Sequence, residues 1–130
     1  MKKIIKFILL LVLTFLPSVG NVFAEEKIKI GLLVPLTGKN SEIGQSIIKA
    51  VRLAINQINN LSIEIIPRDT ASSPEITLRS AKELEALDVK IVIGPVFNEN
   101  LIYLDELTNL IFLSLTNKNN NGSKNIINAG

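Results

Sequence analysis

Apolar residues along this chain recur with two different spacings, and the spacing changes at short polar segments. The segment from Lys27 to Val34 alternates at first and then becomes continuously apolar, which is typical of a strand that becomes buried on both faces of a sheet. From Ser41 onward the spacing follows the period of about 3.6 residues of an amphipathic helix, with Asn40 or Ser41 as its cap. The apolar positions of this helix are Ile43, Ile47, Val51, Ala54, Ile55 and Ile58.

The same two patterns repeat further along the chain. Ser62 to Pro67 predicts a second strand. A second helix is expected to open at Ser73, whose hydroxyl can accept from unpaired amides, with Pro74 in the first turn, where its missing N–H costs nothing. The apolar side of this helix consists of Leu78, Ala81, Leu84 and Leu87.

Two more strands are predicted, at Lys90–Gly94 and Leu110–Leu115. Leu101, Leu104 and Leu107 lie between them and predict a short third helix that Asn98 or Asn100 could cap. An Asn-rich polar loop follows, and Ile126-Ile127 then looks like the start of another strand, close to the last residue, Gly130.

Strands that alternate with helices predict an α/β fold, a three-layer Rossmann-like parallel sheet with right-handed crossovers and helices on both faces. Ile30, Leu32 and Val34 are expected to face one side of the sheet and Leu33 the other. The three apolar residues of the third strand, Ile91, Val92 and Ile93, are expected to be buried beside them.

Residues 1–24 resemble a secretory signal peptide and leave residues 25–130 as the mature domain. Three lysines precede an apolar block from Phe7 to Leu16, and Val22-Phe23-Ala24 supplies small residues for cleavage after Ala24. A membrane anchor is the alternative, but about ten apolar residues fall well short of the roughly 20 that cross a bilayer as a helix. We therefore expect a periplasmic protein without a lipid anchor, because the chain has no Cys.

Composition excludes several classes of function. Removing residues 1–24 takes away three of the 14 basic residues and none of the 12 acidic ones, so the net charge changes from +2 to −1. Nucleic-acid binding therefore has little support. With no His and no Cys, the chain has no imidazole base, no thiolate nucleophile and no zinc site of the usual kind. No catalytic residue, metal site or cofactor is predicted. Asp69 is expected to hydrogen-bond the turn into the next helix, with contact to a ligand as the alternative.

Three loops follow the predicted first, third and fourth strands, where ligands bind in open parallel sheets. They read PLTGKNS, GPVFNEN and SLTNK. Each combines residues that turn the chain with short side chains that form hydrogen bonds. Every sheet of this kind has loops at this edge, so ligand binding and simple chain turning both stay open from the residues alone.

At these residues the sequence resembles the type I periplasmic binding proteins of the Leu/Ile/Val-binding kind. The resemblance rests on KIKIGLLVPLTGKNSEIGQSIIKAVRLAINQIN, PRDTASSPEITLRSAKELEALDVKIVIGPV and IFLSLTN followed by INAG. Within that family, the phrases PRDT, IGP and LSLTN look most like the subgroup of penicillin-binding protein activators.

The resemblance implies a Venus-flytrap receptor, of which this chain is an incomplete first lobe without the second. Such receptors close over a small ligand, often an amino acid or amide, and present it to a membrane permease. By position, the first-lobe half of the cleft would be lined by Thr37, Gly38, Val96, Phe97, Asn98, Ser114 and Thr116. Amino-acid binders usually carry small hydroxyl residues where Phe97 and Asn98 stand here.

Three interpretations from different classes follow. The first is a solute receptor of an ABC-type uptake system, with a cleft that holds a carboxylate. The second is a regulator of peptidoglycan synthesis similar to the penicillin-binding protein activators, with a cell-wall synthase as its partner. The third is a truncated product of a receptor-like gene, without activity.

Overall fold

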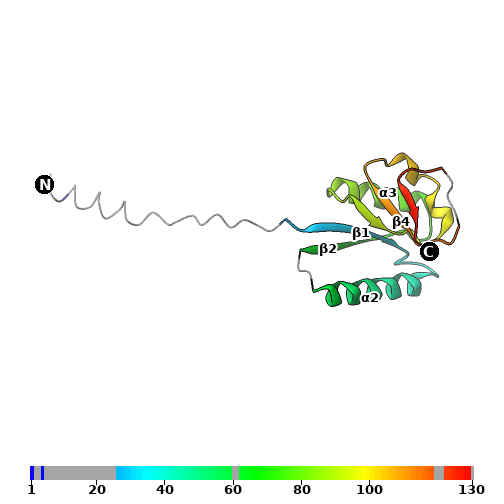
Figure 1. The fold of residues 1–130 in the computed structure, drawn as a ribbon, viewed down its shortest axis with the longest axis horizontal. Coiled ribbons are helices and arrows are strands. Elements are labelled where there is room, and N and C mark those ends of the chain that lie inside the picture. The colour runs from blue at the N-terminus through cyan, green and yellow to red at the C-terminus, as the bar shows by residue number, and fades with distance from the viewer. Residues whose placement is uncertain (2–3, 5–25, 60–61, 119–121, 130) are drawn as a thin grey trace.

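The computed structural model describes residues 1, 4, 26–59, 62–118 and 122–129, and its centre is a parallel sheet of five strands (Figure 1). The strands lie in the order β2-β1-β3-β4-β5. Their bounds are β1 Ile28–Val34, β2 Ile63–Asp69, β3 Ile91–Ile93, β4 Ile111–Ser114 and β5 Ile126–Asn128. The α/β class and the parallel sheet are confirmed, and β5 is the strand predicted at Ile126. The predicted signal peptide lies outside the described residues, apart from Met1 and Ile4.

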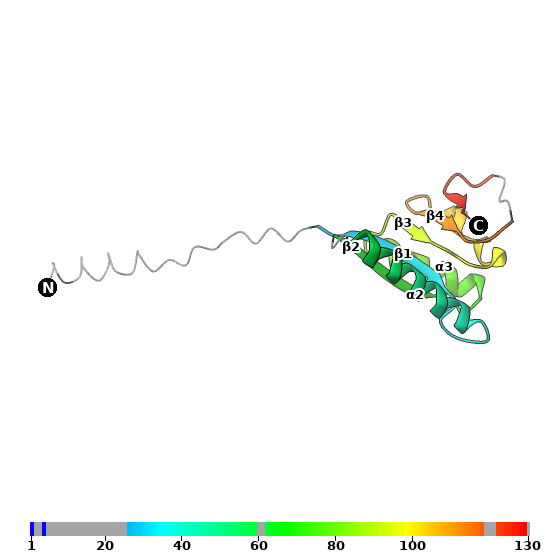
Figure 2. The ribbon, with the colours of Figure 1, turned by 60° about the horizontal axis from the view of Figure 1, so that its bottom comes forward.

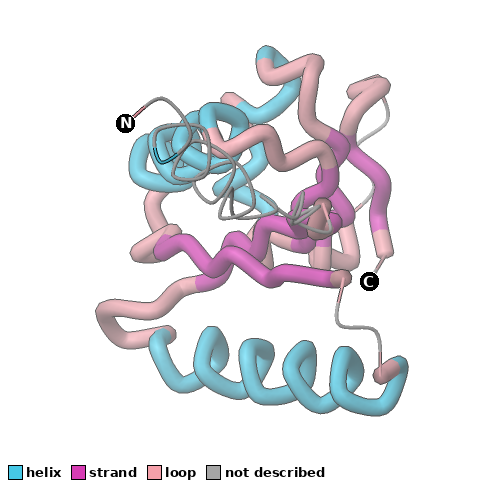
Figure 3. The backbone as a smooth tube through the Cα atoms, turned by 90° about the vertical axis from the view of Figure 1, so that its left-hand side faces the viewer, coloured by secondary structure: helices cyan, strands magenta, loops and turns pink. Residues whose placement is uncertain are grey.

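Helical segments lie on both faces of the sheet, which gives three layers (Figures 1 and 2). Among the described residues, one face carries a single helix, α2 (Ser41–Ile58). The opposite face carries α3 (Pro74–Ala86) and two short 3₁₀ segments, η1 (Asn98–Leu101) and η2 (Leu104–Glu106). Figure 3 shows this asymmetry, with one helix below the strands and the other helical segments above them.

The hydrophobic core lies on the face that α3 covers. Leu33, Val92, Phe112 and Ile126 point from four neighbouring strands toward α3 and the 3₁₀ segments, where Ala81, Leu84, Leu101 and Leu104 complete the cluster. Leu32 and Val34 are also fully buried. Because side chains alternate along a strand, they lie on the α2 face, opposite Leu33 as predicted.

Burial of the third strand is predicted correctly for only one of its residues. Val92 is fully buried, whereas Ile91 is 39% exposed and Ile93 is half-buried. Ile91 and Ile93 point to the face that carries α2. On that face, α2 lies over β1 and β2 and does not cover β3. The expected burial of the apolar positions of the first two helices is likewise incomplete, since Gly44 is the one buried residue of α2 and Leu87 is 39% exposed.

The expected third helix is wrong, because Asn98–Leu101 and Leu104–Glu106 form two 3₁₀ segments instead. Leu101, Leu104 and Leu107 are three residues apart, and residues at this spacing are aligned in a 3₁₀ geometry. All three are buried in the core, so the pattern located the apolar side correctly but not the type of helix. Neither 3₁₀ segment has a side-chain cap.

The two α-helices differ in how their first turns are capped. Ser73 caps α3 by accepting from the Ile76 amide at 3.4 Å, with Pro74 as the first helical residue, as predicted. Asn40 precedes α2 but makes no capping bond. The side-chain amide of Asn40 instead donates to the Ser72 hydroxyl at 3.0 Å. This bond ties the loop after β1 to the loop after β2.

Candidate functional site

The candidate site is the edge of the sheet at which all five parallel strands end. β1 continues into α2 on one face, whereas β3 continues into the 3₁₀ segments on the other. The two connections therefore diverge between the neighbouring strands β1 and β3, and such a divergence is where open α/β sheets bind ligands. The loops after β1, β3 and β4 lie at this edge, as predicted from the sequence.

Asp69, the last residue of β2, holds the loop after β1 in place. Its Oδ1 accepts from the amides of Leu36 at 2.7 Å and Ala71 at 2.8 Å, and more weakly from the amide of Thr37 at 3.4 Å. Its Oδ2 accepts from the Thr37 hydroxyl at 2.6 Å. The expectation that Asp69 hydrogen-bonds its own turn is confirmed, and the same carboxylate also binds the neighbouring loop.

These bonds keep Asp69 ionised. Partial burial by itself would raise the pKa of this carboxyl. Hydrogen bonds from the Thr37 hydroxyl and from the amides of Leu36, Ala71 and Thr37 outweigh that effect and hold the pKa below its ordinary value. Thr37 and Gly38 are exposed, so the tip of this loop is open to solvent while the bonds to Asp69 hold its start in place.

Asp69→Asn is expected to destabilise the chain by about 1 kcal/mol near neutral pH, because asparagine offers one acceptor oxygen where the carboxylate offers two. Folding lowers the pKa of Asp69, so its contribution is complete above the unfolded-state pKa of about 4 and is lost as the pH falls through the folded-state value. Urea unfolding of both proteins near neutral pH and near pH 3 measures the difference. The same difference at both pH values would contradict this role, and exposed Asp105→Asn is the control.

The loop after β3 is fixed by its backbone. Gly94 has φ of +105°, and a Cβ there would lie 2.2 Å from the Leu33 carbonyl oxygen, so a side chain does not fit. The Gly94 amide donates to Leu113 O at 2.8 Å, and the Leu115 amide donates to Pro95 O at 3.1 Å. The loops after β3 and β4 are therefore bonded directly to each other.

Two asparagines that follow this turn carry polar atoms without partners. Asn98 Oδ1 is buried with no hydrogen bond, and so are both side-chain polar atoms of Asn100. Asn100 is only 1% exposed, and buried amides are normally paired. The sequence predicted Asn98 as a site residue but suggested only a cap for Asn100, because nothing in a polar run of this kind marks one residue as buried.

The loop after β4 is held by hydrogen bonds between its own residues. The Ser114 hydroxyl oxygen accepts from the Thr116 amide at 3.2 Å, and the Thr116 hydroxyl donates to Lys118 O at 3.4 Å. Both side chains are buried, Ser114 completely. The hydroxyl protons of Thr37 and Thr116 are thus used inside the protein, and both oxygens keep lone pairs that can accept from a ligand.

The seven predicted site residues fall into three groups at this edge. Thr37 and Gly38 are exposed, whereas Val96, Phe97 and Asn98 are half-buried and Ser114 and Thr116 are buried. Hydrogen bonds connect the loops of the second and third groups. The loop with Thr37 is instead bonded to the loop after β2.

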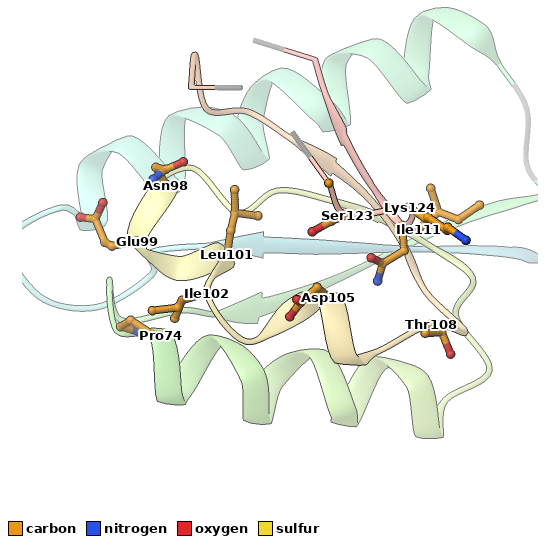
Figure 4. A pocket seen from close by; sticks show the side chains of 12 residues that line it. Pro74, Asn98, Glu99, Leu101, Ile102, Asp105, Thr108, Ile111, Ser123 and Lys124 are labelled. Atoms are coloured by element: carbon orange, nitrogen blue, oxygen red, sulfur yellow. The ribbon is translucent and has the colours of Figure 1, made fainter. Parts of the chain in front are cut away.

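A hollow of about 1270 Å³ begins at this edge (Figure 4). It runs along η1 and η2 opposite the segment 122–125, with Asn98 and Glu99 at one end and Thr108 and Lys124 at the other. Asn98 is the one predicted site residue that lines it. We therefore keep the candidate site at the loops that follow β1, β3 and β4, and do not place it along this groove.

The part of the chain that the structure describes shows neither a candidate metal site nor a candidate membrane-spanning helix. It contains no group of three or more acidic, His or Cys side chains that could hold a metal ion. No helix within the same residues is long and apolar enough to cross a membrane.

Solved structures with a similar fold include binding proteins and a regulator of PBP1A. The leucine-binding protein LivK from Thermotoga maritima superimposes with a TM-score of 0.68 at 19% identity, over 76% of this chain and 31% of that one. A solute-binding protein of an ABC transporter from Rhodopseudomonas palustris, in complex with 3,4-dihydroxybenzoic acid, gives 0.62 at 28% identity, over 71% and 28%. The C-domain of LpoA from Haemophilus influenzae, a regulator of PBP1A, gives 0.55 at 23% identity, over 69% and 28%.

The chain therefore spans less than a third of the length of these structures. No curated protein sequence matches it. A family model for periplasmic binding proteins matches residues 27–128, which include every described strand and both α-helices. The chain belongs to the periplasmic binding protein family.

Proposed function

We propose that the chain is the ligand-binding part of a periplasmic receptor, the substrate-binding component of an ABC-type uptake system for an amino acid or amide. Its ligand-bound form would be presented to a membrane permease. The family supports this role, and so do the ABC solute-binding proteins among the similar structures. Because the family is a class of ligand-binding proteins, we propose no catalysis.

The observation that carries the proposal is the set of acceptor oxygens at the carboxyl edge. Thr37 and Thr116 donate their hydroxyl protons within the protein, and Asn98 Oδ1 has no partner. Ammonium and amide N–H groups are the donors that such oxygens accept from. The proposed ligand-binding residues are Thr37, Gly38, Val96, Phe97, Asn98, Ser114 and Thr116.

We further propose that residues 1–24 direct export and are removed, and that residues 25–130 form part of the first lobe of a two-lobe receptor. A lobe without its counterpart lacks half of the contacts and does not exclude water. An affinity near micromolar, roughly −8 kcal/mol, is then expected to fall to millimolar or weaker, roughly −4 kcal/mol.

The experiment is an NMR titration of the exported protein, whose mass should first place the amino terminus at or near Glu25. Leucine, other aliphatic amino acids and their amides are added to millimolar concentrations. We expect weak binding that shifts the amide signals of Gly38, Asn98 and Thr116. Asn98→Ala should abolish the shifts, whereas Asn56→Ala, which removes an exposed amide from α2, should retain them.

Two results would overturn the proposal. One is an absence of shifts at the carboxyl edge with every amino acid and amide. The other is an intact Met1 on the exported protein, which would overturn the removal of residues 1–24.

A regulator of peptidoglycan synthesis is the second candidate, and three observations favour it. Phe97 and Asn98 stand where amino-acid binders usually carry small hydroxyl residues, and Ser114 and Thr116 are buried. The C-domain of LpoA shares the fold. This candidate requires that the chain bind a purified cell-wall synthase while the amino acids and amides give no shifts.

A further inference from the structure

A groove runs along the 3₁₀ segments on the face of the sheet that carries α3. It is the hollow of about 1270 Å³ described above, and Asn98 is the one proposed ligand-binding residue among those that line it. One wall comes from η1 and η2, and the other comes from residues 122–125 (Figure 4). A ligand of this groove would therefore contact side chains that the proposed receptor site does not use.

The 3₁₀ geometry of the first wall sorts its side chains into rows. Residues three apart are aligned in a 3₁₀ helix, and the amides of Asn100, Leu107 and Leu110 each donate to the carbonyl three residues earlier. One row is buried in the core and consists of Leu101, Leu104, Leu107 and Leu110. The next row is exposed and lines the groove from left to right in Figure 4, in the order Glu99, Ile102, Asp105 and Thr108.

Charged and apolar side chains alternate along this exposed row. Glu99 and Asp105 flank Ile102, which at 65% is more exposed than any other large apolar side chain described between residues 26 and 129. Neither carboxylate forms an ion pair within the described residues. A single exposed isoleucine is ordinary on a protein surface. This one, however, lies in a groove between two unpaired carboxylates.

Spacing along the exposed row limits what can bind. A 3₁₀ helix rises about 2 Å per residue, so neighbours in the row are about 6 Å apart and the two carboxylates about 12 Å apart. That is too far for both to hold one metal ion, whose oxygen ligands lie within about 2.6 Å. An extended peptide rises about 3.3 Å per residue, so its alternate side chains repeat at about 6.6 Å and stay aligned with the row.

The opposite wall supplies main-chain groups and a positive charge. Residues 122–124 form no main-chain hydrogen bond within the part of the chain that the structure describes, so their peptide groups are available to a ligand. Lys124 lies at the Thr108 end of the groove and forms no ion pair with a described residue. A ligand therefore meets two negative charges along the groove and a positive charge at that end.

We propose that the groove binds an extended segment of a partner polypeptide whose alternate side chains are basic, apolar, basic and acidic. The basic side chains pair with Glu99 and Asp105, the apolar one covers Ile102, and the acidic one meets Lys124. Charge complementarity of this kind gives specificity more than affinity, so a short segment is expected to bind weakly. A linear polyamine would pair with the two carboxylates, but it would meet Lys124 with a like charge and leave Ile102 uncovered.

The test is an NMR titration of the exported protein with a synthetic peptide, Lys-Ala-Leu-Ala-Lys-Ala-Glu, acetylated and amidated at its ends. We expect it to shift the amide signals of Ile102, Asp105 and Ser123, which line the groove, and not those of Gly38 and Thr116 in the receptor site. A peptide of the same composition in the order Lys-Lys-Ala-Ala-Glu-Leu-Ala lacks the alternation. It should bind at least about tenfold more weakly.

Matched variants test the charges of the groove. Glu99→Gln with Asp105→Asn removes both carboxylates at exposed positions and should weaken peptide binding at least about tenfold. Glu64→Gln with Glu106→Gln removes two exposed carboxylates that do not line the groove and should leave binding unchanged. Lys124→Met should weaken binding of this peptide, but not of a version that carries glutamine in place of its glutamate.

Several results would show that the groove does not bind such a segment. They are equal binding of the two peptides, equal weakening by the two double variants, and shifts at Gly38 and Thr116 in place of the groove. An absence of shifts at millimolar peptide has the same meaning. A linear polyamine such as spermidine that binds as tightly as the peptide would also overturn the proposal, because the groove would then recognise positive charge alone.

Discussion

Replacing Val92 by Asp is expected to leave the chain unfolded. Val92 is fully buried in the middle strand, between Gly31 of β1 and Phe112 of β4. An unpaired carboxylate at such a position costs several kcal/mol, against a total stability of roughly 5 to 15 kcal/mol for a domain. Circular dichroism and urea unfolding measure the result, and a helical spectrum with a cooperative transition would contradict the burial of Val92.

The neighbouring residue provides the control. Ile91→Asp introduces the same charge in the same strand, but Ile91 points to the face that carries α2 and is 39% exposed, so the carboxylate keeps much of its hydration. This variant should fold with a modest loss of stability. Equal damage by both substitutions would mean that the two faces of β3 do not differ as described.

The contrast between Val92 and Ile91 also shows what the sequence could predict. Continuous apolar runs located the central strands to within a few residues, because only buried strands tolerate such runs on both faces. The same runs predicted burial for all three residues of Ile91–Ile93, which was wrong for Ile91 and only partly correct for Ile93. Burial depends on what lies above a face, and the residues of a strand do not reveal whether the covering helix is present.

The 3₁₀ segments show a related limit. Leu101, Leu104 and Leu107 marked the side of the chain that packs on the core, and all three are buried. A spacing of three residues is compatible with an α-helix and with 3₁₀ turns. The choice between them depends on how the chain reaches β4 over the packed core, and that path is a tertiary property.

At the candidate site, the order of strands and loops could be predicted from the sequence, but the hydrogen-bond partners of individual residues could not. The order of strands and helices was sufficient to bring three loops to one edge. The bond that Asp69 accepts from Ala71 lies in a tight turn in which Ala71 and Ser72 have positive φ values of 46° and 55°. Non-glycine residues rarely adopt such values, so no local sequence rule predicts this turn. The burial of Asn100 was missed because nothing in the polar run around it marks one residue as buried.

Gly44→Ala is expected to destabilise the chain although it improves helix propensity. Alanine is favoured over glycine within a helix by about 1 kcal/mol. A Cβ at Gly44, however, would lie 1.8 Å from the carbonyl oxygen of Pro35, which belongs to the backbone and cannot rotate away. The first turn of α2 must then move off the end of β1, and overpacking of this kind costs typically about 1 to 3 kcal/mol.

The balance of the two effects gives a net loss of up to about 2 kcal/mol, measured by urea unfolding. Gln45→Ala is the control, because Gln45 is the exposed next residue of the same turn and its replacement changes propensity without meeting the sheet. The shift of α2 should also move the loop that joins it to β1, so the amide signals of Thr37 and Gly38 should change in Gly44→Ala and not in Gln45→Ala. If Gly44→Ala were instead more stable than the unaltered chain, the gain in helix propensity would exceed the cost of the contact with Pro35. Helix α2 would then not lie against Pro35.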